Sequence, residues 1–178
     1  MACDITNGFV LGCRDNTGGI KALYILSGSV SSITDTTNEI SDIDGTGIFY
    51  QFDLQRNTSD FTETINGSTE NGTVFYEATV NAVFAKLQTS VRNQIKVLAA
   101  NPDLKIVVET NNDQSGSKFF YVGRVHGAQL NGGQGQSGTA IGDANGYTLT
   151  FSSQEPNPAD VITGTTLADA LTGITVSQ

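Results

Sequence analysis

The sequence has no tryptophan, one histidine, two cysteines and three prolines among its 178 residues. A single histidine excludes metal sites that need several, and it leaves His126 as the only possible base of a catalytic triad. Two cysteines are too few for a disulfide framework. Cys3 and Cys13 are expected as reduced, buried thiols, with one bridge across their ten-residue separation as the alternative.

Basic residues are also scarce. Nine Lys and Arg stand against 18 Asp and Glu, which gives a formal net charge of −9 and a pI near 4.3. A protein that grips duplex DNA uses a basic surface to contact the phosphates, and this composition excludes such a protein. An acidic protein that lies near DNA without gripping it remains compatible, because like charges repel at short range.

Long apolar runs are absent, since no stretch approaches 18 consecutive apolar residues. The first four residues lack the basic start and the apolar run of a signal peptide, so we expect a soluble protein made in a cytosol, without membrane contact. The length suits one domain with one core. We expect a β domain over residues 1–155 and a C-terminal arm over 156–178, where the strand pattern weakens.

Alternating apolar and polar residues are the main structural signal. Two alternating runs, 48–65 and 74–84, flank a turn-rich loop at 66–72 and predict a hairpin arm of unusual length. The apolar face of this arm consists of Tyr50, Phe52, Leu54, Tyr76, Val80 and Phe84. Shorter runs predict further strands at 20–26, 104–108, 118–125 and 147–151.

One helix is predicted near residues 90–100. Val91, Ile95, Leu98 and Ala99 share a stripe there, and Thr89 or Ser90 is available as N-cap. The predicted fold is therefore mainly β, an antiparallel β-sandwich or barrel with a long hairpin arm and one flanking α-helix.

No motif in the sequence carries chemistry. Residues 133–138 match G-x-G-x-x-G, but they neither follow a buried parallel strand nor open an apolar helix, so a flexible glycine-rich loop is predicted over 128–142. His126 precedes a glycine at a strand end and is expected to be structural. We expect no enzyme, no cofactor and no metal, because no carboxylate pair, phosphate loop or nucleophile elbow is present.

Three stretches resemble the tail-tube proteins of tailed bacteriophages. They are the segment from Cys3 to Cys13 running into 18–22, the passage 83–89 continuing to Leu98-Ala99, and 142–151 with Glu155-Pro156 after it. The acidic, β-rich composition, the long two-stranded arm and the single helix fit the same resemblance. It implies a virion tail protein whose copies assemble into rings, usually sixfold, that stack into a tube and meet other tail proteins. DNA passes through the tube without being bound.

The resemblance also implies roles for the arm. Its polar face would line the lumen, with Gln51, Asp53, Gln55, Asn57, Glu77, Thr79 and Asn81. Its apolar face, given above, would form the core between subunits. A tail terminator, a ring below the portal and a head decoration protein remain open. An alternative from another class is a β-sandwich module that binds a receptor or a carbohydrate.

Overall fold

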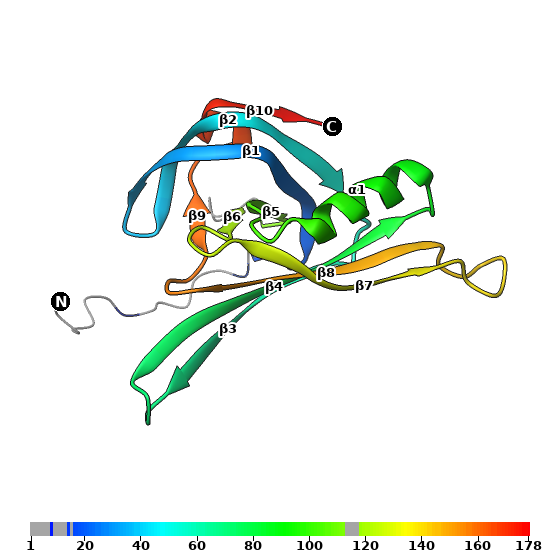
Figure 1. Cartoon of the computed structure of the whole chain (residues 1–178), viewed down its shortest axis with the longest axis horizontal. Helices are drawn as coiled ribbons and strands as arrows, with labels where there is room; N and C mark the ends of the chain where they lie inside the picture. The colour runs from blue at the N-terminus through cyan, green and yellow to red at the C-terminus, as the bar shows by residue number, and fades with distance from the viewer. Residues whose placement is uncertain (1–7, 9–13, 15, 113–117) are drawn as a thin grey trace.

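The computed structural model describes residues 8, 14, 16–112 and 118–178, which form two β-sheets and one α-helix (Figure 1). The six-stranded sheet, called the barrel sheet, contains β1 (Ile20–Thr36), β2 (Glu39–Asp53), β5 (Ile106–Thr110), β6 (Phe119–Val122), β9 (Asp160–Ile162) and β10 (Leu171–Ser177). The four-stranded sheet, called the open sheet, contains β3 (Asp60–Ser68), β4 (Thr73–Ala85), β7 (Ala128–Gln136) and β8 (Gly146–Glu155). The helices are α1 (Thr89–Ala100) and the short 3-10 helix η1 (Leu167–Ala170). The predicted mainly β sandwich or barrel with one flanking α-helix is confirmed.

The barrel sheet closes on itself. Its strands follow the order β1-β5-β6-β9-β2, and β2 pairs back onto β1 in antiparallel register, from Ala22 opposite Asp53 to Thr36 opposite Glu39. Large side chains fill the interior, among them Phe49, Phe119 and Tyr121. The barrel is therefore a packed core and not a channel.

The open sheet packs against the outer wall of the barrel. The core between the two layers includes Leu23 and Ile106 from the barrel and Val80 and Phe151 from the open sheet, each with no exposed surface. Helix α1 covers the margin of this core with Ile95 and Leu98, both half-buried, as its apolar stripe predicted. Its N-cap is Gln88 instead of the expected Ser or Thr.

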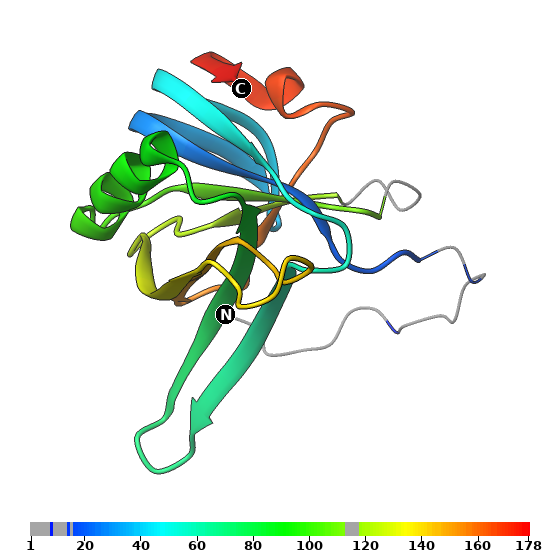
Figure 2. The same cartoon turned by 90° about the vertical axis from the view of Figure 1, so that its right-hand side faces the viewer.

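The hairpin arm differs from the prediction. Residues 48–53 belong to β2 and pair with β1, whereas β3 starts only at Asp60. A turn separates the two strands, with Asn57 at φ 61° and the Thr58 hydroxyl donating to the Gln55 carbonyl. The long hairpin is therefore β3–β4, and its tip projects beyond the rest of the molecule in both views (Figures 1 and 2).

Two further segments correct the expectations from sequence. Residues 128–136 form strand β7 rather than a flexible loop, and Gly133 and Gly135 lie so close to Leu149 and Tyr147 that an added Cβ would come within 2.7 and 2.9 Å of them. The segment 156–178 is not a separate arm, because β9 and β10 both pair in parallel with β2.

Arg124 joins two distant parts of the barrel sheet. Its guanidinium donates to Asp35 near the end of β1 at 2.9 Å and to Asp160 at the start of β9 at 2.8 Å. The Asp160 side chain is only 4% exposed, so this ion pair satisfies a buried charge. The hydrogen bond from Arg124 lowers the pKa of the Asp35 carboxyl below its ordinary value of 3.8.

Removing the aromatic ring of Phe151 should damage the core between the layers. We expect Phe151→Ala to lower the free energy of unfolding by about 3–5 kcal/mol, through lost burial and a cavity. Urea denaturation measures this loss. Val125→Ala, at a side chain that is 58% exposed, is the control and should change stability by no more than about 0.5 kcal/mol. Equal effects of the two substitutions would contradict the assignment of the core.

The Asp35–Arg124 contact predicts a pH dependence. Because the folded pKa of Asp35 is depressed, its contribution to stability is present above the unfolded pKa and is lost as the pH falls through the folded pKa. Asp35→Asn should therefore be less stable than the wild type at pH 7, and the difference should shrink in strongly acidic buffer. Urea denaturation at both pH values checks this. A stability difference that stays constant on acidification would show that the ion pair is not formed.

Candidate functional site: the polar face of the open sheet

The open sheet has one face on the core and one face turned away from it. Phe61, Val80 and Phe151 lie opposite one another in the register of β3, β4 and β8, and all three belong to the core. The side chains between them alternate to the other side. This polar face consists of Asp60, Thr62, Thr64, Asn66, Ser68, Thr73, Phe75, Glu77, Thr79, Asn81, Val83, Gln129, Gln134, Gln136, Thr148, Thr150, Ser152 and Gln154.

The polar face carries hydroxyl and amide groups with very little charge. Its only ionisable side chains are Asp60 and Glu77, and no Lys or Arg belongs to it. Phe75 is its only aromatic residue and is 38% exposed. The face is therefore weakly acidic and hydrated, and it lacks the cations that bind phosphates.

Hydrogen bonds across the strands hold these side chains in place. The Asn81 amide donates to both carboxylate oxygens of Asp60, at 3.3 and 3.2 Å, and the Thr150 hydroxyl donates to Asn81 at 2.9 Å. Nearer the tip, Asn66 donates to Glu77 at 3.3 Å. Both carboxylates are thus bound by a neighbouring amide, and the chain Asp60–Asn81–Thr150 spans three adjacent strands.

Both outer strands of the open sheet offer free edges. In the order β3-β4-β8-β7, β3 pairs only with β4, and β7 pairs only with β8, among the strands that the structure describes. On the other side of β7, Ala128 forms the one backbone bridge among the described residues, with Leu104, and helix α1 packs near the strand. Unpaired backbone N–H and C=O groups on such edges are templates for pairing with another strand.

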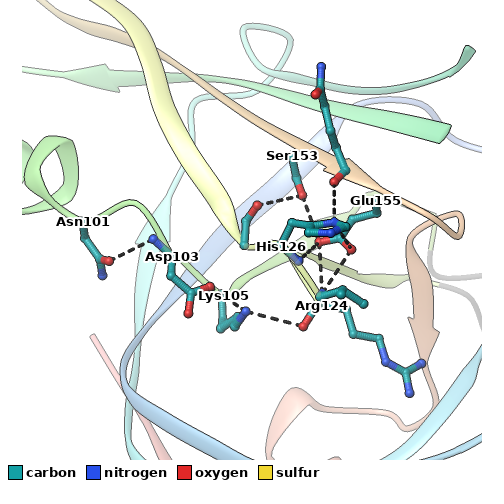
Figure 3. Close-up of polar contacts among 10 residues, drawn as sticks. Asn101, Asp103, Lys105, Arg124, His126, Ser153 and Glu155 are labelled. Atoms are coloured by element: carbon teal, nitrogen blue, oxygen red, sulfur yellow. Dashed lines mark hydrogen bonds and ion pairs between the residues drawn. The ribbon is translucent and has the colours of Figure 1, made fainter.

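Glu155 fixes the start of the edge strand β7 (Figure 3). Its carboxylate accepts from the backbone N–H of Val125 at 3.1 Å and of His126 at 2.9 Å. The Ser153 hydroxyl lies 3.0 Å from the Gly127 carbonyl oxygen. These contacts fasten the turn between β6 and β7 onto the end of β8, so the position of the edge is set by buried polar groups.

The residues around Glu155 do not form a catalytic relay. His126 Nδ1 lies 3.0 Å from the backbone carbonyl of Gln154, and its side chain is 64% exposed. Ser153 is bonded to Gly127 and Glu155 instead of His126. A nucleophile in such a site needs a hydrogen bond to its base, and this arrangement lacks one.

The predicted lumen residues lie in three places. Glu77, Thr79 and Asn81 lie together on the polar face. Gln51 and Asp53 lie at the end of β2 in the barrel sheet, where the Gln51 amide donates to Asp53. Gln55 and Asn57 lie in the following turn. The prediction of one surface made by all seven residues is wrong, because alternation continues in the sequence across the break between β2 and β3.

The predicted core between subunits lies mostly within the chain. Val80 is fully buried, and the Phe84 ring packs edge to face on Phe52 with centroids 5.8 Å apart. Leu54 packs against the same core. Tyr76 is half-buried, and only Tyr50 is largely accessible, at 42%. These apolar residues turn toward the chain's own barrel, which the sequence could not distinguish from a neighbouring subunit.

Sequence reasoning missed the polar-face residues of β3, Asp60 among them, and all those of β7 and β8. The alternation at 147–151 predicted β8 but not which face would be covered. In β7, the repeated Gln and Gly of 132–136 follow a period of two, which was the available signal for a strand.

Comparisons with models of protein families, with curated proteins and with solved structures found no match for this chain. Within the described ranges, no helix is long and apolar enough to cross a membrane, and no group of three His, Cys, Asp or Glu residues could hold a metal ion. Cys3 and Cys13 lie outside the described residues.

Loss of the Glu155 carboxylate should loosen the start of β7. We expect Glu155→Ala to lower the free energy of unfolding by about 1–3 kcal/mol, since two backbone N–H groups lose their acceptor. Gln154→Ala, one residue earlier and exposed, should stay within about 0.5 kcal/mol of the wild type. Urea denaturation of both variants measures the difference. An unchanged stability of Glu155→Ala would mean that Glu155 does not anchor the turn.

Proposed function

We propose that this chain is a structural subunit of a virion tail tube, in which copies join through the open sheet and its polar face lines a channel for DNA. One observation carries the proposal. The open sheet has two free edges. The chain's own barrel covers one of its faces, and the other face carries amides and hydroxyls but no cation. The resemblance to tail-tube proteins supports the same reading.

The two free edges match in length. β3 and β7 each have nine residues, and they form opposite margins of the same sheet. If β3 of one copy pairs with β7 of the next, every copy satisfies both edges, and repetition closes a larger barrel. Such pairing is heterologous and closes into a ring when the rotation between copies divides a full turn. Six copies is the number that the resemblance implies.

The chemistry of the polar face suits passage of DNA better than binding. Duplex DNA is held through counterion release when Lys and Arg neutralise its phosphates, and this face has neither. Asp60 and Glu77, repeated in every copy, repel phosphates over a Debye length of about 10 Å at 0.1 M salt. The Asn66 and Asn81 amides already donate to Glu77 and Asp60, so these two amides are not free donors for the bases.

A carbohydrate-binding module is the second candidate. A groove of about 560 Å³ runs beside Phe75 and is lined by Glu77, Gln129 and Gln154. One aromatic ring with amides and a carboxylate is a combination that sugars can use. The groove has only one aromatic ring on which a sugar could stack, so we rank the carbohydrate-binding module below the tube subunit.

Electron microscopy of negatively stained purified protein tests the proposal directly. We expect rings or hollow tubes, which should persist when Cys3 and Cys13 are replaced by Ser. Isolated particles of 18.7 kDa at all concentrations and salts would contradict the tube. Oligosaccharide binding to such particles in a glycan array would favour the second candidate.

Charge reversal tests the lining. Asp60→Lys with Glu77→Lys should leave the tubes intact but make them retain duplex DNA at low salt, with release as salt rises, because counterion release now favours binding. Fluorescence anisotropy of a labelled duplex measures the retention. The matched control, Glu39→Lys with Asp53→Lys, changes the net charge equally on exposed positions of β2 and should not retain DNA. Equal retention by both variants would place DNA outside the polar face.

A further inference from the structure

The tip of the β3–β4 hairpin exposes apolar side chains on its core-facing side. Ile65 is 68% exposed and Val74 is 59% exposed. Ile65 lies opposite Tyr76 in the hairpin register, and Val74 lies opposite Gly67, so both belong to the face that packs on the barrel closer to the body. The tip extends past the barrel (Figure 2), which leaves these two side chains without cover from their own chain.

A groove on another part of the molecule has matching character. It lies between α1 and the strands β1 and β2, has a volume of about 570 Å³, and is lined by Tyr50, Phe52, Val97 and Leu98 among others. Val97 is 63% exposed and Tyr50 is 42% exposed. Helix α1, which forms one wall of the groove, lies on the opposite side of the molecule from the hairpin tip (Figure 1).

The charges near the two surfaces are opposite. Glu70 lies in the loop at the hairpin tip, between β3 and β4, and no basic residue lies within 60–85. Within residues 86–100, which lead into and form α1, three are basic and none is acidic: Lys86, Arg92 and Lys96. Within the groove, Lys105 and Asp103 form an ion pair with each other. The tip, with its acidic and apolar side chains, and the partly apolar groove beside a basic helix are complementary in apolar exposure and charge.

We propose that the hairpin tip of one copy inserts Ile65 and Val74 into the groove beside α1 of another copy. The partner is a second copy of this chain, because the complementary surface is present on the same molecule and carries the opposite charge. Since the projecting and receiving surfaces differ, the contact is head to tail and can continue from copy to copy. It rests on the proposed function only for the expectation that copies assemble, and it adds a second contact to the pairing of β3 with β7.

Disulfide trapping tests the contact in solution. Copies carrying Ile65→Cys and copies carrying Val97→Cys, both with Cys3 and Cys13 replaced by Ser, are mixed in equal amounts and oxidised. We expect a cross-linked dimer that forms about tenfold faster than in the control mixture or more, since docked thiols meet at an effective concentration in the millimolar range. The control pairs Ile65→Cys with Val125→Cys, a valine of similar exposure, 58%, outside the groove. Circular dichroism confirms that all variants fold.

A charge exchange gives an independent measurement. Glu70→Lys at the hairpin tip, or Lys96→Glu on the helix, should each weaken assembly in light scattering at low salt. The two substitutions combined in one chain should restore it, because the attraction is re-formed with reversed signs.

The outcomes separate this inference from the proposed function. Assembly of the wild type without faster cross-linking at Val97 than at Val125 overturns the docking alone, as does a combined charge variant no better than the weaker parent. A wild type that never assembles overturns both the docking and the tube.

Discussion

The packing of the open sheet on the outer wall of the barrel is the interaction on which the rest of the structure depends. Val80 and Phe151 lie fully buried against Leu23 and Ile106, so one face of the open sheet is fixed to the body. Because side chains alternate along a strand, burial of that face turns Glu77, Thr79 and Asn81 outward together. The polar face is therefore a consequence of the core.

The same packing leaves two strand edges and the hairpin tip of the open sheet without partners in their own chain. The barrel closes its own strands, but β3 and β7 remain at the margins of the open sheet, and the hairpin tip extends past the apolar wall that would cover it. Folded proteins protect long free edges because these promote pairing with other chains. In the assembly that we propose, the edges, the apolar tip and the groove beside α1 would all be covered by neighbouring copies.

Sequence patterns predicted the elements whose signal is local. The stripe of Ile95 and Leu98 indicated α1, and alternation indicated β4 and β8. Pairing could not be deduced, because residues 48–53 have the same alternation as β3 but pair with the preceding strand, β1. In β7, Gly133 and Gly135 suggested a loop, although they lie in a strand where Leu149 and Tyr147 approach them closely. Glu77, Thr79 and Asn81 of the site were therefore found from β4, and its residues on β3, β7 and β8 needed the structure.

Backbone hydrogen exchange, followed by mass spectrometry as the protein concentration is raised, tests the pairing of copies through the open sheet most directly. Pairing of β3 with β7 of the next copy predicts that amides in 60–68 and 129–136 exchange more slowly in the assembled protein than in dilute solution. The central strands β4 and β8 should change little, because their partners are already present in one chain. Assembly that leaves exchange at both β3 and β7 unchanged would contradict the account.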